Sequence, residues 1–117
     1  MKNFKQLKIW QKGFDIAVEI YRFAATLPKE EKFGLALQMT KAAVSIPSNI
    51  AEGSSRHSDK DNSRFVEISL GSSFELETQL LIAKAAAMGN VELCDALLMQ
   101  LSSEQRMLTT YLKSLNL

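Results

Sequence analysis

Apolar residues recur at three- and four-residue steps along most of the chain, which is the spacing of one buried face of an α-helix. The longest unbroken stripe consists of Leu35, Met39, Ala42, Ile46 and Ile50. Pro47 lies inside this stripe, and a proline within a helix removes a backbone hydrogen bond at a cost of about 3 kcal/mol or more. We therefore predict one helix over residues 33–52 that is kinked at Pro47, with other elements packed around the kink.

The same periodicity predicts three further helices. The first covers residues 7–26, with Leu7, Trp10, Phe14, Ala17, Tyr21 and Ala24 as the stripe that faces the bundle. Pro28 separates it from the second helix, which we expect to end at Gly53. Ser58 begins a capping signal for the third helix, whose apolar residues lie on nearly two sides. Gly89 and Asn90 then mark the change to a fourth helix.

Four helices with short connections and no alternating strand pattern predict an all-α, antiparallel up-and-down four-helix bundle. At 117 residues the chain has the length of one domain, over 1–117. The apolar residues of helices three and four exceed what one core needs, so we expect some to form contacts between copies. A charge at Leu98 is then predicted to dissolve the oligomer without unfolding the protomer.

Small residues in the third helix predict where the kink packs. Gly71, Ser72 and Ser73 would form a notch that admits the helix around Pro47. We expect Ser72 or Ser73 to hydrogen-bond either Asn49 or the carbonyl freed by the proline.

Glu52 is predicted to pair with Arg56, four residues later on the same helical face. A second interpretation places Asn49 and Glu52 at a contact between subunits.

Composition restricts the class of protein without naming an activity. The formal net charge is only +1, so any polyanion binding must come from a local patch. Cys94 is the only cysteine, which excludes an intramolecular disulfide and a cysteine metal cluster. The sequence contains neither a signal-peptide pattern nor an apolar run long enough to span a membrane. We therefore expect a cytoplasmic protein that does not contact membranes.

Residues able to carry chemistry do not form a recognised catalytic or ligand motif. His57 is the only histidine and falls in a predicted loop, and the chain contains neither a phosphate-binding glycine loop nor a nucleophile elbow. We expect no enzyme activity, cofactor, metal or small-molecule substrate. A hydrolase that uses the region of Ser48 and His57 remains as a less favoured alternative.

Lysine and arginine residues near two predicted helix starts are candidates for nucleic-acid binding. Lys5, Lys8 and Lys12 precede the first acidic residue, and in an up-and-down bundle they share one end with the start of the third helix. The cations near that start are Arg56, Lys60 and Arg64. Together these six residues form a predicted basic rim for RNA or a ribonucleoprotein. One alternative is that these residues form an ordinary solvated face. Another is that the protein is a scaffold that binds only proteins.

Four stretches resemble the 23S rRNA-intervening-sequence proteins, a bacterial family of four-helix bundles. They are residues 4–11 (FKQLKIWQ), 28–35 (PKEEKFGL), 45–53 (SIPSNIAEG) and 71–77 (GSSFELE). The resemblance implies a left-handed bundle that assembles into a ring-shaped homopentamer. It also implies similarity to the accessory variability proteins of diversity-generating retroelements, which are basic pentamers that associate with a reverse transcriptase and nucleic acid. The near-neutral charge of this chain departs from those basic relatives.

Overall fold

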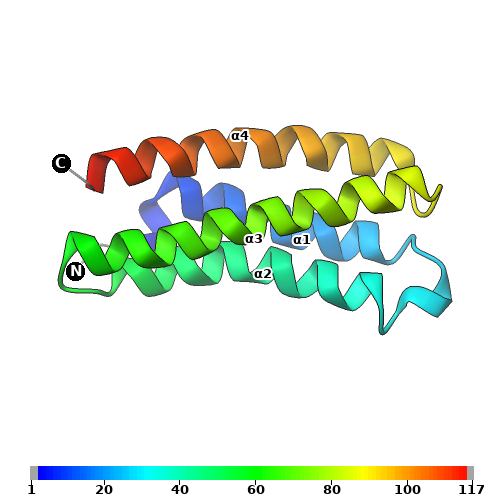
Figure 1. The fold of residues 1–117 in the computed structure, drawn as a ribbon, viewed down its shortest axis with the longest axis horizontal. Helices are drawn as coiled ribbons and strands as arrows, with labels where there is room; N and C mark the ends of the chain where they lie inside the picture. The colour runs from blue at the N-terminus through cyan, green and yellow to red at the C-terminus, as the bar shows by residue number, and fades with distance from the viewer. Residues whose placement is uncertain (1–2, 116–117) are drawn as a thin grey trace.

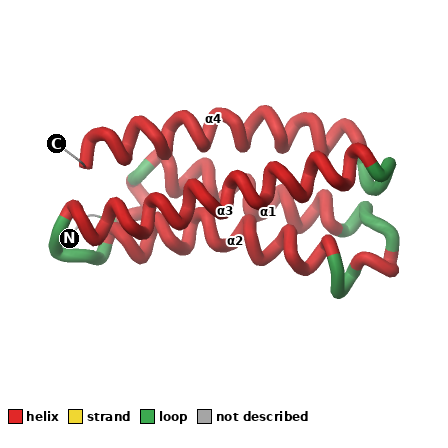
Figure 2. Tube along the Cα trace, viewed as in Figure 1, coloured by secondary structure: helices red, strands yellow, loops and turns green. Residues whose placement is uncertain are grey.

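Four long α-helices account for most of residues 3–115, which are the residues that the computed structural model describes. They are α1 (Lys8–Ala24), α2 (Leu35–Ser54), α3 (Asp59–Ala85) and α4 (Val91–Leu115) (Figure 1). Two short 3₁₀ turns, η1 (Phe4–Gln6) and η2 (Lys29–Glu31), precede α1 and α2. Within the described range every regular element is helical, as Figure 2 shows. The prediction of an all-α fold is confirmed.

The connections between helices alternate between the two ends of the molecule (Figure 1). As a result, α1 and α3 begin at one end, where α2 and α4 finish. Helices α2 and α4 each pack against both α1 and α3, whereas no Cα atom of α1 lies within 8 Å of one in α3. Helices α1 and α3 are therefore diagonal partners across a common core.

Side-chain caps fix two of the helix starts at the predicted residues. The Ser58 hydroxyl accepts a hydrogen bond of 3.1 Å from the Asp61 amide, and the Asn90 side chain accepts one of 2.9 Å from the Leu93 amide. Each cap satisfies a backbone donor that has no partner within its own helix.

The end of α2 differs from the prediction, because the helix continues past Gly53 to Ser54. A Cβ atom at position 53 would lie 2.6 Å from the Asn62 side-chain oxygen. The glycine is therefore needed for the close approach of α3 rather than for ending the helix.

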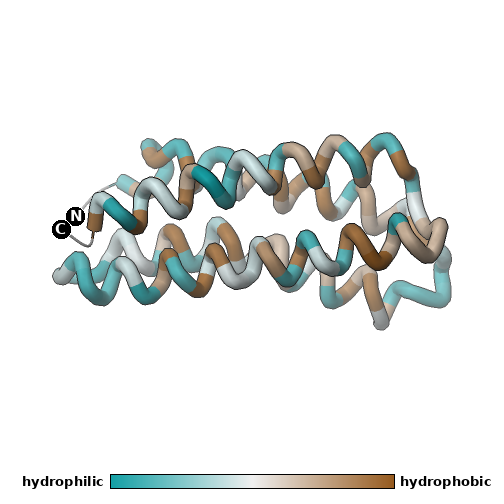
Figure 3. Tube along the Cα trace, turned by 45° about the horizontal axis from the view of Figure 1, so that its top comes forward, coloured by the Kyte–Doolittle hydropathy of each residue, from teal (hydrophilic) through white to brown (hydrophobic). Residues whose placement is uncertain are grey.

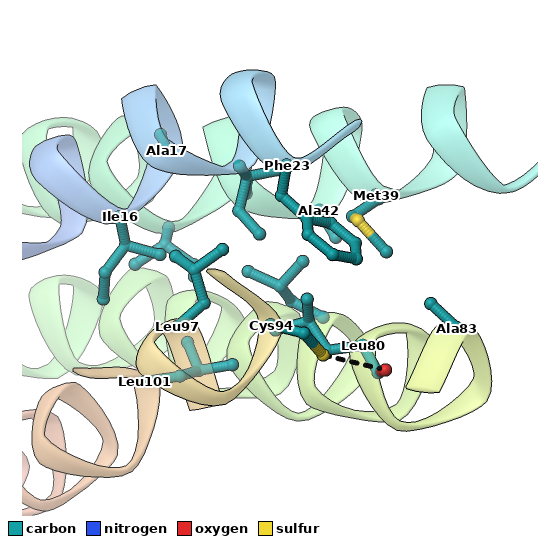
Figure 4. Packing of buried hydrophobic residues seen from close by; sticks show 14 of the residues in the cluster. Ile16, Ala17, Phe23, Met39, Ala42, Leu80, Ala83, Cys94, Leu97 and Leu101 are labelled. Atoms are coloured by element: carbon teal, nitrogen blue, oxygen red, sulfur yellow. Dashed lines mark hydrogen bonds between the residues drawn. The ribbon is translucent and has the colours of Figure 1, made fainter. Parts of the chain in front are cut away.

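The stripe predicted for α2 does face the core. Met39, Ala42, Ile46 and Ile50 are buried, and α2 remains helical through Pro47. Figure 4 shows side chains of all four helices converging there, including Ile16, Leu80, Leu97 and Leu101. The thiol of Cys94 is buried among them and donates to the Leu80 carbonyl at 3.4 Å.

The stripe predicted for α1 is mostly wrong, because Ala17 is the only one of its six residues that is buried. Phe14 and Tyr21 are 47% and 57% exposed, and Trp10 is only half-buried. The core is instead met by a second stripe of the same period, composed of Ile9, Gly13, Ile16, Ile20 and Phe23. Both stripes repeat at three- and four-residue steps, and the aliphatic one packs against the other helices. Figure 3 shows apolar and polar positions interspersed along the helices.

More apolar residues of α3 and α4 pack in or against the protomer core than predicted. Val66, Leu97 and Leu101 are core residues, and the half-buried Leu98 packs against that core. A charge at Leu98 would therefore disturb the protomer itself, so this position cannot separate folding from assembly. The large apolar residues of α3 that are exposed are Ile68, Phe74, Leu81 and Ile82.

Candidate functional site

Serine residues of α3 hold α2 at the two residues that precede Pro47. The Ser69 hydroxyl donates to the Ile46 carbonyl at 2.9 Å, and the Ser72 and Ser45 hydroxyls are 2.7 Å apart. Asn49 completes the network within α2, since its side-chain amide donates to the Ser45 carbonyl at 2.8 Å.

This network differs in detail from the expected one. Ser72 reaches Ser45 rather than Asn49, while Ser73 donates to Leu70 within α3. Gly71 is exposed with no atom near its Cβ position, so it does not form the floor of a notch. Ser69, which the sequence analysis did not single out, makes the bond to a backbone carbonyl of α2.

A fully buried carboxyl group lies on the other side of Pro47. Glu104 of α4 has no exposed surface, and neither of its carboxyl oxygens has a hydrogen-bond partner. A Cβ atom built on Gly13 would lie 2.9 Å from Glu104 Oε2 and 3.6 Å from the Pro47 nitrogen. Burial raises the pKa of Glu104 to about 8, and the nearby positive charge of Lys12 only partly opposes this. The group is therefore mainly neutral at pH 7.

Glu104 was not among the predicted site residues, although its spacing places it on the buried face of α4. The buried residues of α4 are Cys94, Leu97, Leu101, Glu104 and Leu108, so Glu104 occupies a position of the apolar stripe. An acidic residue in such a stripe is the signal that would have found it.

The six predicted basic residues separate into two groups. At the start of α3, Arg56 pairs with Glu52 at 2.6 Å, which confirms that predicted contact, and stacks 4.6 Å from the Phe65 ring. Arg64 lies 3.6 Å from a carboxylate oxygen of Asp61. Lys60 is exposed and has Asp59 and Asp61 as sequence neighbours. Acidic residues therefore offset the charge of this group.

The second group lies where α1 begins and α4 ends, and we call it the basic edge. It contains Lys5, Lys8 and Lys12 with two cations that were not predicted, Arg106 and Lys113. The sequence has no acidic residue before Asp15 and none after Glu104, which is itself mainly neutral. Among the described residues, the ion pairs include none of these five cations. The positive charge of this edge is thus not compensated locally.

A groove of about 440 Å³ runs between the two helices at this edge, and we call it the basic groove. Its lining comprises Leu7, Lys8 and Ile9 from the start of α1 and Arg106, Met107, Thr110, Tyr111 and Ser114 from α4. Lys8 is exposed on one wall and Arg106 on the other, above a mainly apolar floor.

A second groove, of about 380 Å³, lies between α1 and α2, and we call it the aromatic groove. Its lining contains the exposed stripe of α1, with Trp10, Phe14, Val18 and Tyr21, and the α2 residues Val44, Pro47, Ser48 and Ala51. The Trp10 ring packs against Phe14, with 5.1 Å between the ring centroids. This groove therefore presents an almost wholly apolar surface.

The residues proposed for a hydrolase are not assembled into one site. Ser48 and Asn49 line a shallow pocket on α2, while His57 is exposed in the connection to α3 and does not line that pocket. The described residues also contain no cluster of three potential metal ligands. None of the helices in residues 3–115 is long and apolar enough to cross a membrane.

Comparison with known sequences settles the family. The profile of the 23S rRNA-intervening sequence protein family matches residues 5–110, which is most of the chain. The chain belongs to this family. No protein with a curated description matches it.

A solved structure shows the same fold. It is a crystal structure of a protein of unknown function from the S23 ribosomal protein family of Bacteroides thetaiotaomicron. The alignment covers 90% of this chain and 95% of that chain, with a TM-score of 0.82 and 23% identity. At this identity the likeness establishes a shared fold and leaves the activity open. The similarity of the present chain to retroelement accessory proteins stays a prediction.

Proposed function

We propose that this protein is a non-enzymatic, homo-oligomeric binding scaffold, and that its basic edge binds RNA, either bare or within a ribonucleoprotein. The protomer is an antiparallel, left-handed up-and-down bundle with its second helix kinked at Pro47. The observation that carries the RNA assignment is the charge of the basic edge, where five cations take part in none of the ion pairs among the described residues. Such a cluster attracts phosphates by releasing their counterions.

Two different apolar surfaces support self-association. The aromatic groove lies on the α1–α2 side, and Ile68, Phe74, Leu81 and Ile82 are exposed on the diagonal helix α3. When one patch of a protomer binds a different patch of the next, the contact is head-to-tail and closes into a ring if the rotation permits. This favours a ring over a two-fold dimer, and the family resemblance implies five copies.

Assembly would also strengthen RNA binding. Each copy in a ring repeats the basic edge, so one RNA strand can contact several weak sites at once. The alternative hypothesis, a scaffold that binds only proteins, predicts exposed surfaces that are apolar rather than basic. Here the apolar surface and the basic edge lie at different places, so self-association and polyanion binding need not compete.

The test is light scattering after size exclusion, with and without a structured ribosomal RNA fragment, at low and physiological ionic strength. We expect an oligomer whose mass increases with RNA, and loss of this increase in the Lys8→Glu plus Arg106→Glu variant. The matched control is Lys60→Glu plus Arg64→Glu, which makes the same charge change where acidic residues already surround the cations. An oligomer that ignores RNA even at low salt would reject the proposal and favour protein partners.

A further inference from the structure

The basic groove combines two kinds of chemistry within one cavity. Leu7, Ile9, Met107 and Tyr111 contribute apolar surface, and Lys8 and Arg106 stand on opposite walls. A ligand that fills the groove must therefore present an apolar face together with negative charge. A nucleotide does so, because its base has a π-face and its phosphate is anionic.

Both cations are available for a phosphate. The Arg106 guanidinium donates at 2.9 Å to the neutral Ser102 hydroxyl, which leaves its charge unpaired and most of its donors free. Lys8 takes part in none of the ion pairs formed by residues 3–115. Placing cations on two facing walls allows them to contact one phosphate or two successive phosphates of a strand.

Hydroxyl groups in the lining suit the edge of a base. Thr110 donates to the Arg106 carbonyl at 3.0 Å, and Ser114 donates to the Tyr111 carbonyl at 2.6 Å. Their protons are used in these bonds, so their oxygens face a ligand as acceptors. Exocyclic amines and ring N–H groups of bases are donors.

The cavity size and the accessibility of bases limit the form of the nucleic acid. A volume of about 440 Å³ is within the range of small-molecule sites and admits a nucleotide. In a duplex, however, each base is stacked and paired, so that its face is covered. Proteins contact base faces in unpaired loops, bulges and ends, where the base can be turned outward.

We propose that the basic groove binds an unpaired nucleotide of single-stranded RNA, with the base against Tyr111 and Met107 and the phosphate between Lys8 and Arg106. This inference rests on the proposed RNA-binding function and specifies the strand form that the site selects. It requires no base-specific readout, because the floor is apolar and every base offers a similar face.

Filling the groove without changing its charge tests the inference. Thr110→Phe adds an aromatic ring at an exposed position of the lining. Thr109→Phe is the matched control, because Thr109 is an exposed neighbour with an equivalent bond to its own helix but lies outside the groove. Binding of the full-length variants to a short fluorescent single-stranded RNA, and to the corresponding duplex, is measured by anisotropy. Circular dichroism verifies that both variants fold.

We expect the unchanged protein to prefer the single strand and Thr110→Phe to weaken that binding about tenfold, in line with the loss of one stacked base. Duplex binding should not change, and Thr109→Phe should bind both forms normally. If both RNA forms bind equally, or Thr110→Phe has no effect on the single strand, the groove does not hold a base while RNA binding by the edge stands.

Two other outcomes separate the proposals further. If neither RNA form binds at low salt, the proposed RNA-binding function fails together with the groove. A free nucleoside monophosphate that binds as tightly as the strand would show a nucleotide site that does not use the RNA chain. An acidic amphipathic peptide that binds at the groove when RNA does not would identify a protein-docking site instead and overturn the assignment.

Discussion

At the scale of single residues, Glu104 is the group whose chemistry depends most on its surroundings. Its carboxyl group is enclosed beside Gly13 and Pro47, and the Lys12 charge is the nearby cation that opposes the rise in its pKa. A buried carboxyl without hydrogen bonds favours the neutral form, because charging it in an apolar site is costly. Stability of this bundle should therefore depend on whether that one proton is bound.

The sign of the pH effect follows from the raised pKa. Below about pH 4.5, its ordinary value, the group is protonated in both the folded and unfolded states. Between that pH and about 8 only the folded state keeps the proton, so stability falls as pH rises. Above the folded-state pKa the full penalty applies, and it is on the order of a few kcal/mol.

Glu104→Gln removes the titratable carboxyl group while keeping the shape of the side chain. We expect the variant to resemble the unchanged protein near pH 4.5 and to be more stable at pH 8, by a few kcal/mol. Urea denaturation at both pH values measures the difference. Glu67→Gln, at an exposed site on α3, is the control and should show no such divergence. An equal effect of Glu104→Gln at both pH values would contradict the assignment of a buried neutral acid.

At the scale of elements, the contact between α2 and α3 depends on α3 serines that bond the residues just before Pro47. The proline removes one hydrogen bond from α2, and Ser69 and Ser72 supply bonds from the neighbouring helix at Ile46 and Ser45. Small side chains also permit the two backbones to approach closely. Proline and serine therefore act together across the two helices.

Ser72→Leu should destabilise the protomer, because it removes the hydroxyl partner of Ser45 and places a larger side chain in a half-buried contact. We expect a loss of about 1–3 kcal/mol, the usual size of an overpacking effect. Thermal unfolding followed by circular dichroism measures it. Gly71→Ala is the control, since its Cβ position is open, and should be tolerated or slightly stabilising. Unchanged melting of Ser72→Leu would show that this contact is not specific.

At the scale of the whole molecule, the exposed aromatic stripe of α1 is the main candidate for assembly. Large apolar side chains that remain exposed in a groove are typical of a protein contact surface. The aromatic groove lies away from the basic groove, on the opposite flank of α1. The bundle thus has separate surfaces for the proposed contact between copies and for the proposed charged partner.

Phe14→Glu plus Tyr21→Glu should convert the proposed oligomer to folded monomers. The two side chains are about half exposed in the protomer, so charging them costs little folding stability but opposes an apolar contact. Light scattering gives the mass, and circular dichroism reports helicity. Phe33→Glu, at a position 82% exposed in the connection before α2, should leave the oligomer intact. An oligomer of unchanged mass after the double substitution would exclude the aromatic groove as the contact.

The sequence alone determined the number of helices, their approximate limits and the buried face of α2. Local chemistry was sufficient there, because Ser58 and Asn90 cap helices through near neighbours and the α2 stripe has no competitor of equal strength. It also gave the family, through motifs that span most of the chain.

Only the tertiary structure decided which stripe of α1 is buried and which cations are free. Two stripes of equal period compete on α1, and the absence of a side chain at Gly13 leaves room for Glu104 and Pro47 from other helices. Likewise, Arg56 and Arg64 meet acids within their own segment, whereas Lys8 and Arg106 come together from distant parts of the chain. Periodicity describes a helix by itself, but burial and charge compensation depend on its neighbours.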